Sequence, residues 1–561
     1  MIMKRACLPF LVLAAFPFYS AAQTPPAINP IPGNPVDTIT PRPVPSAPPP
    51  IPIAAPPTPR DQALKHLLSH TLTPRVFDVS GVTAVPFEDV IAILEPLAGR
   101  AMTLGALIDE VNRITALYQQ RGFLLSFALI QAQDFKDGLI KVTVVEGHVG
   151  QTLLQGQPGP IAKQIRAYAR HIEAEKPLTK ATLERYLNLI SNTYGVTVQP
   201  TLAMPKREDG AAELALNISR KPVALEGGIS NLGTSTHGML TARTQSLTAL
   251  AEQVQVSVAV PRGSEKLHYA AASAAVPLNS HGLEIKLDGF HYDAHPRSTY
   301  LDALGIDRQV RNQRIGLSLS YPFLLSNQQR LAGTLGIYGL NSRDRYTGRQ
   351  TGLSIGSDTT LRVAKAELSY SRSQQRWTQR WTGFAHAGID GLGAKQSTRG
   401  LSESDLDFYR LGLSTQHSVL LPQQFGLSLS ALLQYSPHQL ASAEQVTFGS
   451  QRFGLGYPAG ELGGDKGWGL SAELNRKLFI STGWLQVLQP YLTLDHARIG
   501  LNRANTGLLK RQISSAALGL RFSDQKHYAL DINVAKPIGP APNEKPDRPW
   551  RLNASYSFKF D

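Results

Sequence analysis

Two stretches near the carboxyl end of the chain carry residues whose types and spacing suggest a specific role. The first, residues 448–465, reads FGSQRFGLGYPAGELGGD. It is too rich in glycine for a buried strand and too long for a hairpin turn, so we expect a loop with a structure of its own. Its candidate site residues are Arg452, Gly454, Gly456, Tyr457, Gly460 and Asp465.

The second stretch, residues 489–498, alternates as a β-strand does. Tyr491 and Asp495 fall on one face of this strand, and Leu492 and Leu494 fall on the other. A carboxylate on the inner face of a barrel strand, close to a structured loop, suggests that the loop folds inward and is tethered there. We therefore take Asp495 and Tyr491 as the candidate wall partners of the loop.

Catalytic and metal-binding chemistry finds little support in the sequence. The glycine-rich residues 460–469 are not followed by the Gly-Lys-Ser/Thr of a phosphate-binding loop. The 14 histidines form no HExxH spacing, and the chain has no Gly-x-Ser-x-Gly motif. We expect no enzymatic activity, no cofactor and no metal. A catalytic site inside a barrel, of the kind outer-membrane proteases have, stays open as an alternative.

The amino-terminal residues indicate export. Residues 1–22 combine Lys4 and Arg5, a short apolar core and a Ser-Ala-Ala end, which is typical of a signal peptide. The single cysteine, Cys7, lies inside that segment, so we expect no disulfide in the mature chain. The net charge of +14 is spread along the chain without interleaved aromatic residues, which argues against nucleic acid as a partner.

The segments that precede and position the barrel can be predicted in order along the chain. Residues 23–59 are saturated with proline and predict an extended linker, and residues 60–72 predict a short helix. Two consecutive units then share the order strand, helix, helix, strand, strand, at residues 75–149 and 150–222. In each unit a threonine, Thr103 or Thr179, stands where it can cap the second helix.

From residue 223 to residue 561 the pattern changes to short strands of period two, as in Val254, Val256 and Val258. An apolar face opposite a polar face over many strands fits a closed barrel in lipid with a wet lumen. About 340 residues at roughly 10 per strand, plus loops, allow about 16 strands. The final strand ends in aromatic residues on one face. We take Tyr556, Phe558 and Phe560 as the candidate signal for insertion of the barrel into the membrane.

These features together resemble the two-partner secretion transporters, called TpsB, of the ShlB/FhaC/HecB haemolysin secretion/activation type. The residues that carry the resemblance are the paired modules, Gly456-Tyr457, the following Gly-Asp and the Pro-Tyr-x-x-x-Asp strand that ends at Asp495. The resemblance implies two periplasmic POTRA modules followed by a transmembrane β-barrel of 16 strands. It also implies that an amino-terminal helix such as 60–72 can plug the barrel, although a helix resting on the first module is the other interpretation.

In the resembled family an arginine directly before Gly-Tyr meets the wall aspartate, but here that position holds Leu455. We hypothesise that Arg452 reaches Asp495 instead and that Tyr457 packs nearby. The alternative is a hydrated Asp495 and a solvated Arg452.

The resemblance implies a pore in the outer membrane of a Gram-negative bacterium, with its modules in the periplasm. Its expected partners are a TpsA-type exoprotein with an N-terminal secretion domain, outer-membrane lipid and the barrel-assembly machinery. The exoprotein would cross the pore unfolded, by protein transport of the type V kind. Two other functions stay open, namely a barrel-assembly insertase of the same superfamily and a passive porin.

Overall fold

The computed structural model describes residues 68–560, apart from 132, 134, 206–208, 231–235, 263–266, 297–298, 451–452, 481, 504–506 and 544–546. The predicted signal peptide, the proline-rich linker and most of the predicted helix over 60–72 therefore lie outside the described residues. The end of that helix prediction is wrong, because Thr71–Leu72 form strand β1, which pairs with β3 (Met102–Thr103). Leu72 packs against the core of the first module, which favours the paired, extended backbone.

The first module is a three-stranded sheet covered by two helices. Its elements are β2 (Val76–Ser80), α2 (Phe87–Leu94) with the 3₁₀ turn η2 (Glu95–Leu97), α3 (Leu104–Gln120), β4 (Phe127–Ile130), η3 (Lys136–Gly138) and β5 (Leu139–Val145). The sheet order is β2-β5-β4, with β2 and β5 parallel. Helix α3 turns its apolar stripe, which includes Leu107 and Ile114, into the core.

A partly buried carboxylate, Glu146, ties the first module together. The Oε1 atom of Glu146 accepts hydrogen bonds from the backbone N–H groups of Thr83 and Ala84 and from the Tyr118 hydroxyl, each at 2.7 Å. Burial opposes the charge of Glu146, but these hydrogen bonds outweigh burial and hold its pKa below the ordinary value. Glu146 thereby links β5 to α3 and to the segment before α2.

The second module repeats the first, as the sequence predicts. Its elements are β6 (His148–Gly156), η4 (Gly159–Ile161), α4 (Ala162–Ala174), α5 (Lys180–Ser191), β7 (Val196–Leu202) and β8 (Ala211–Arg220), and its sheet order is β6-β8-β7. The two capping threonines behave alike. Thr103 accepts a hydrogen bond from the Ala106 N–H at 3.2 Å, and Thr179 accepts one from the Thr182 N–H at 3.2 Å.

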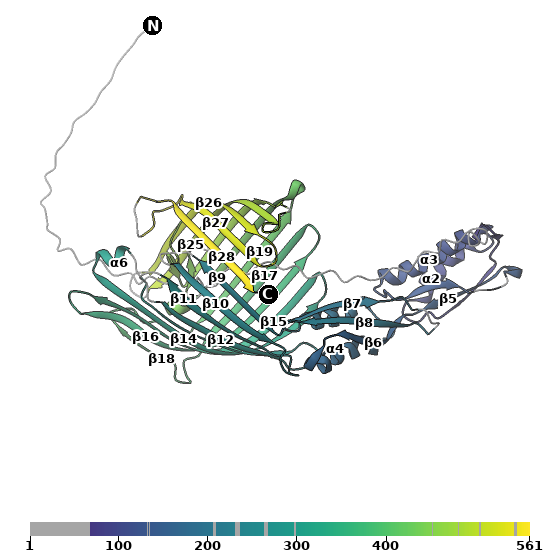
Figure 1. The fold of residues 1–561 in the computed structure, drawn as a ribbon, viewed down its shortest axis with the longest axis horizontal. Coiled ribbons are helices and arrows are strands. Elements are labelled where there is room, and N and C mark those ends of the chain that lie inside the picture. Colours follow the sequence, from purple (N-terminus) through teal and green to yellow (C-terminus); the bar gives the residue numbers. More distant parts are fainter. Residues whose placement is uncertain are drawn as a thin grey trace, which may run out of the picture. The chain divides into compact units, whose positions relative to one another are not determined.

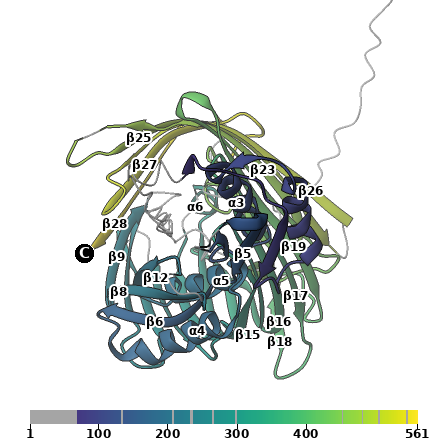
Figure 2. The same cartoon turned by 90° about the vertical axis from the view of Figure 1, so that its right-hand side faces the viewer.

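The remaining chain closes into an antiparallel barrel, which Figures 1 and 2 show from two sides. Its strands are β9 (Val223–Ser230), β10 (Thr236–Gln245), β11 (Gln253–Arg262), β12 (Leu267–Pro277), β13 (Glu284–Ala294), β14 (Ile306–Leu325), β15 (Gln329–Gly348), β16 (Ser354–Ser373), β17 (Trp377–Gly388), β18 (Lys395–Arg399), β19 (Tyr409–Leu420), β20 (Phe425–Tyr435), β23 (Lys466–Arg476), β24 (Leu478–Phe479), β25 (Val487–Arg503), β26 (Gly507–Ser523), β27 (Tyr528–Pro537) and β28 (Arg551–Phe560). The segments β17 and β18 both pair with β16, and β23 and β24 both pair with β25. Each of these pairs fills one place in the wall, so the described strands make the 16-strand barrel that the sequence predicts. Pairing of β28 with β9 closes it.

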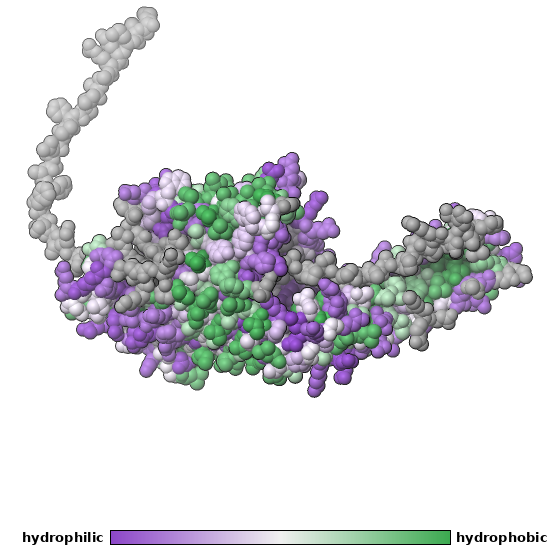
Figure 3. Space-filling model, in the orientation of Figure 1, coloured by the Kyte–Doolittle hydropathy of each residue, from purple (hydrophilic) through white to green (hydrophobic). Residues whose placement is uncertain are grey.

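The barrel wall alternates between an apolar outer face and a polar inner face. On β25, Leu492 and Leu494 are 46% and 51% exposed, whereas Tyr491 and Asp495 are only 4% and 7% exposed. Figure 3 shows the resulting hydrophobic band across the barrel strands. Such a band is what a barrel presents to lipid. No helix among the described residues is long and apolar enough to cross a membrane.

The short turns of the barrel lie at the end that contacts the second module. Arg185 of α5 donates hydrogen bonds to the carbonyl oxygens of Pro322 and His281, each at 3.0 Å. Tyr194 donates to Glu284 at 2.7 Å. The longer connections, among them the one that contains α6 (Thr299–Ala303), lie at the opposite end.

Candidate functional site

The loop between β20 and β23 forms its own small hairpin inside the barrel. After the 3₁₀ turn η6 (Ser442–Glu444), strand β21 (Val446–Phe448) pairs with β22 (Leu462–Gly464) in antiparallel fashion. Phe448 and Tyr457 are fully buried against wall residues of β25 and β26, and the shared cluster consists of Val446, Phe448, Tyr457, Leu462, Ala497, Ile499 and Ile513. The loop is therefore folded inward, because its apolar side covers the inner face of the wall.

Asp495 meets the backbone of the loop. Its Oδ2 atom accepts a hydrogen bond from the Leu455 N–H at 3.2 Å. Its Oδ1 atom accepts from the Ser515 hydroxyl at 2.7 Å and from the Ser515 N–H at 3.2 Å. On the other side of the same residue, the Leu455 carbonyl accepts from the Asn553 side chain at 3.0 Å. Strands β25 and β28 thus hold both polar groups of one loop residue.

Tyr457 and Gly456 determine how closely the tip of the loop, residues 453–457, approaches the barrel wall. The Tyr457 hydroxyl donates to the Pro540 carbonyl at 2.7 Å, and it also lies 3.2 Å from the Ser514 carbonyl. A side chain at Gly456 would place its Cβ 2.6 Å from the Pro537 nitrogen, where no atom fits. The backbone at the tip therefore rests directly on β27.

The turn that leads into the tip, residues 449–454, has backbone φ angles that favour glycine. Gly454 has φ +135° and Gly449 has φ +122°, and Phe453 between them has φ 51°. The Phe453 ring lies over Gly469 of the wall, where a Cβ would approach it to 2.7 Å, and edge-on against Phe448. Gly460 also has a positive φ, +71°, at the return turn.

The stem of the loop is anchored by two buried carboxylates. Asp465 is fully buried and accepts hydrogen bonds from the N–H groups of Leu440 and Asn502 at 2.9 and 2.6 Å and from the Gln445 side chain at 3.1 Å. Glu444 accepts from the Tyr338 hydroxyl at 2.8 Å, and Arg410 of the wall lies 2.8 Å from its carboxylate. Glu444 and Arg410 were not among the residues that the sequence singled out. The only available signal was Glu444 itself, the one acidic residue among residues 436–447 before the loop.

Two further residues that the sequence analysis predicted for this site are Arg452 and Tyr491. Arg452 lies outside the described residues, so its pairing with Asp495 stays a prediction. The Tyr491 hydroxyl donates to Asp531 at 2.6 Å, and the Arg521 guanidinium lies 3.9 Å from the centre of its ring. The structure thus places Tyr491 in a wall network that also holds Glu473, which accepts two hydrogen bonds from Arg521 at 2.6 and 2.7 Å.

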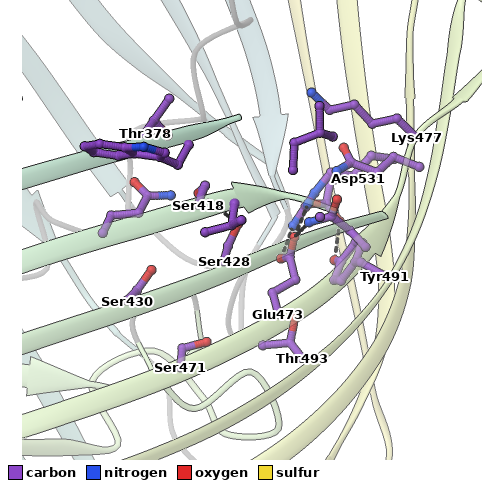
Figure 4. A pocket seen from close by; sticks show the side chains of 18 of the residues that line it. Thr378, Ser418, Ser428, Ser430, Ser471, Glu473, Lys477, Tyr491, Thr493 and Asp531 are labelled. Atoms are coloured by element: carbon purple, nitrogen blue, oxygen red, sulfur yellow. Dashed lines mark hydrogen bonds and ion pairs between the residues drawn. The ribbon is translucent and has the colours of Figure 1, made fainter. Parts of the chain in front are cut away.

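A cavity of about 1160 Å³ opens inside the barrel below the loop tip. Figure 4 shows the labelled side chains of its wall, with small hydroxyl groups in a row and the charged network on one side. The lining hydroxyl residues are Thr378, Ser418, Ser428, Ser430, Ser471, Thr493 and Ser555, and Phe453 and Leu455 border the cavity from the loop. The row of hydroxyl groups offers hydrogen bonds along its length, and charged residues such as Arg380, Glu473 and Arg521 line the cavity beside it, so the surface as a whole suits an extended polar chain.

The final strand carries its aromatic residues outward. The rings of Tyr556, Phe558 and Phe560 follow one another at 5.7 and 4.9 Å between centroids. The Phe558 ring lies over Gly227 of β9, where a Cβ would come within 2.4 Å of it. These aromatic residues therefore face the lipid side of the seam where β28 meets β9.

Three comparisons with known proteins extend these observations. Residues 72–147 match the model described as "POTRA domain, ShlB-type", and residues 214–522 match the one described as "Haemolysin secretion/activation protein ShlB/FhaC/HecB". The Heme/hemopexin transporter protein HuxB of Haemophilus influenzae (strain ATCC 51907 / DSM 11121 / KW20 / Rd) is 22% identical over 474 residues, which cover 80% of each chain. The Outer membrane transporter CdiB of Escherichia coli is 24% identical over 160 residues, covering 28% of this chain and 27% of CdiB.

Among solved structures, CdiB from Escherichia coli superposes with a TM-score of 0.68 at 19% identity, covering 90% of this chain and 93% of that one. BamA from Haemophilus ducreyi lacking POTRA domains 1–3 gives a TM-score of 0.52 at 13% identity, covering 88% and 100%. At such identities these structures establish a shared fold and no more.

Proposed function

The chain belongs to the haemolysin secretion/activation protein family ShlB/FhaC/HecB, and we propose on that basis that it is the outer-membrane pore of a two-partner secretion system. It carries a TpsA-type exoprotein from the periplasm to the cell surface. The single observation that supports this function best is the polar cavity, which the loop tip borders from inside the barrel.

The two modules bind the exoprotein before export. The sheet order of the first module leaves β2 and β4 at the sheet edges, and an open edge accepts an extended segment by strand addition. The N-terminal secretion domain of the exoprotein is the segment that docks there. This step brings the exoprotein to the end of the barrel whose short turns contact the second module.

The exoprotein then passes through the barrel unfolded. A chain in extended form presents backbone N–H and C=O groups, and the hydroxyl-lined cavity exchanges hydrogen bonds with them. The tip at Phe453 and Leu455 moves aside during passage. Folding of the exoprotein outside supplies the drive. Outer-membrane lipid surrounds the barrel, and the barrel-assembly machinery inserts it through the aromatic final strand.

The function is tested by deleting the gene in its own bacterium and comparing the proteins at the cell surface and in the medium. Loss of one large exoprotein, restored by the complete chain but not by a chain lacking residues 75–149, is the expected result. A general loss of outer-membrane barrels would instead indicate an insertase. Unchanged exoproteins, together with steady conductance of the purified chain in planar bilayers, would indicate a porin.

A further inference from the structure

Three neighbouring strands are much longer than a membrane requires. β14, β15 and β16 each have 20 residues, whereas about 9–11 residues span a bilayer in a tilted strand. The short 326–328 turn joins β14 to β15 at the end that contacts the second module. The additional residues therefore project at the opposite end, toward the cell exterior, where Figure 3 shows hydrophilic residues around α6 and the outer parts of β14 and β16.

The outer face of these strands changes sharply in character beyond the lipid-facing band. Ile315, Leu317 and Leu319 of β14 are 63%, 43% and 43% exposed, and Leu335 and Ile337 of β15 are 66% and 60% exposed. Past them the outward positions become polar or charged. The inward positions stay buried, so the alternation holds and the outward assignment is secure.

Positive charge predominates on this outward surface. The cross-strand row of Ile315 and the three rows beyond it contain the cations Arg311, Arg343, Arg345, Arg362, Lys395 and Arg399 and the acids Asp293 and Asp358. The next row adds Asp307, which pairs with Arg349. We call the eight residues named from the first four rows the guanidinium surface. Its six cations exceed its two acids by four charges. Arg311 and Arg343 stand directly opposite each other in the register, an arrangement that is unfavourable unless anions lie nearby.

The two acids satisfy only part of these guanidinium groups. Arg311 donates to Asp293 through Nε and a terminal nitrogen at 2.8 and 2.6 Å, and Arg343 pairs with Asp358. Arg311, Arg343 and Arg345 keep 42%, 44% and 47% of their side chains exposed. An arginine has five N–H donors, so these residues keep donors available for a further anion such as a phosphate.

A loop that carries the exposed Leu392 and the exposed acid Asp390 lies beside the same surface, and Asp390 reduces the excess of positive charge in the combined site from four to three. Between β17 and β18, the residues 389–394 leave the wall, which Figures 1 and 2 show next to β18. The loop is fastened to Arg362, since the Ile389 N–H donates to the Arg362 carbonyl at 2.8 Å and the Arg362 Nε donates to the Leu392 carbonyl at 3.2 Å. Leu392 is nevertheless 80% exposed. A bare leucine next to a fixed guanidinium is unfavourable in water and favourable at a lipid interface.

We propose that the guanidinium surface and the loop 389–394 form a binding site for a phosphorylated glycolipid of the outer leaflet. The phosphates lie against the cations, and the acyl chains run along the apolar band and Leu392. Two observations select lipid over a protein partner. The surface is continuous with the lipid-facing band, and its charge complements phosphate at the level where headgroups begin.

The test uses the complete purified chain and lipid A carrying both phosphates, with bound lipid counted by native mass spectrometry. The variant R343Q/R345Q removes two cations of the site. The matched control, R372Q/K526Q, removes two cations at the opposite end of the barrel. A cation near a membrane surface contributes about 1 kcal/mol, which is roughly fivefold per charge, so we expect about 25-fold weaker binding for R343Q/R345Q and none of that loss for the control.

Three results would overturn the proposal. The first is equal binding of lipid A by the two double variants. The second is binding of dephosphorylated lipid A as tight as that of lipid A with both phosphates. The third is binding of inorganic pyrophosphate as tight as that of lipid A, which would indicate a site for free phosphate. Heat-modifiable migration on gels checks that each variant has a closed barrel. A second variant, L392S, keeps all cations and should weaken binding of lipid A several-fold without changing any binding of pyrophosphate. Loss of both by L392S would contradict the assigned acyl contact.

Discussion

Replacing Gly456 by alanine should release the loop tip from the barrel wall and increase the time that the pore spends open. The φ angle at Gly456 is not in the left-handed region, so the substitution tests contact distance alone. The added Cβ would lie 2.6 Å from the Pro537 nitrogen and 2.7 Å from the Lys536 carbonyl carbon. Both are backbone atoms of β27 and cannot rotate away.

The size of the effect follows from these distances. An ordinary contact begins at 3.4 Å, so the tip must retreat by about 0.8 Å. The hydrogen bond of 2.7 Å from the Tyr457 hydroxyl to the Pro540 carbonyl would then lengthen to about 3.5 Å and be lost. Loss of that bond together with residual strain amounts to about 2 kcal/mol, which is roughly a 30-fold shift toward the released tip.

The assay is single-channel recording of the complete chain in planar bilayers, with the open fraction as the measured quantity. The matched control is Gly483→Ala, because a Cβ at Gly483 meets nothing within 4 Å. We expect a large increase in the open fraction for Gly456→Ala and none for the control. Equal open fractions in the two variants would refute the idea that contact of the tip with β27 keeps the pore closed.

Three further predictions concern the pairing of Arg452 with Asp495, the stability of the first module and the need for that module in export. In a double-mutant cycle on export, Arg452→Ala and Asp495→Ala should be non-additive if the two side chains pair, and strictly additive losses would rule the pairing out. Glu146→Gln should destabilise the first module by about 1 kcal/mol at neutral pH, as measured by urea unfolding, because the carboxylate is only partly buried and glutamine keeps one acceptor oxygen. Folding lowers the pKa of Glu146, so its contribution to stability is present above about pH 4.5 and is lost as the pH falls through the folded-state pKa. The variant should therefore be as stable as the wild type in acid. A difference in stability that stays constant with pH would contradict this. Deleting residues 76–149 should abolish export while leaving a heat-modifiable barrel, and wild-type export would show that the exoprotein docks elsewhere.

Local patterns in the sequence were sufficient for much of the architecture. Period-two alternation depends only on neighbouring residues, so it predicted a barrel of short strands and, in its clearest segments such as residues 254–258 and 489–498, the two faces of the strand. The same holds for the repeat of the two modules, whose capping threonines and turn glycines recur at matching places. Even the inward loop could be predicted, because its glycines exclude an ordinary strand and its length excludes a simple turn.

The partners of the loop could not be read in this way. Leu455 contacts Asp495 through its backbone N–H, a group that every residue except proline has, so no letter in the sequence marks it. Arg410 and Glu444 are 34 positions apart, and they meet only because the loop turns back into the barrel. Closure of the barrel likewise depends on β28 finding β9 in one register, with Phe558 over Gly227. Such pairings are decided by the tilt and stagger of the whole barrel, which are properties of the closed sheet and of no segment within it.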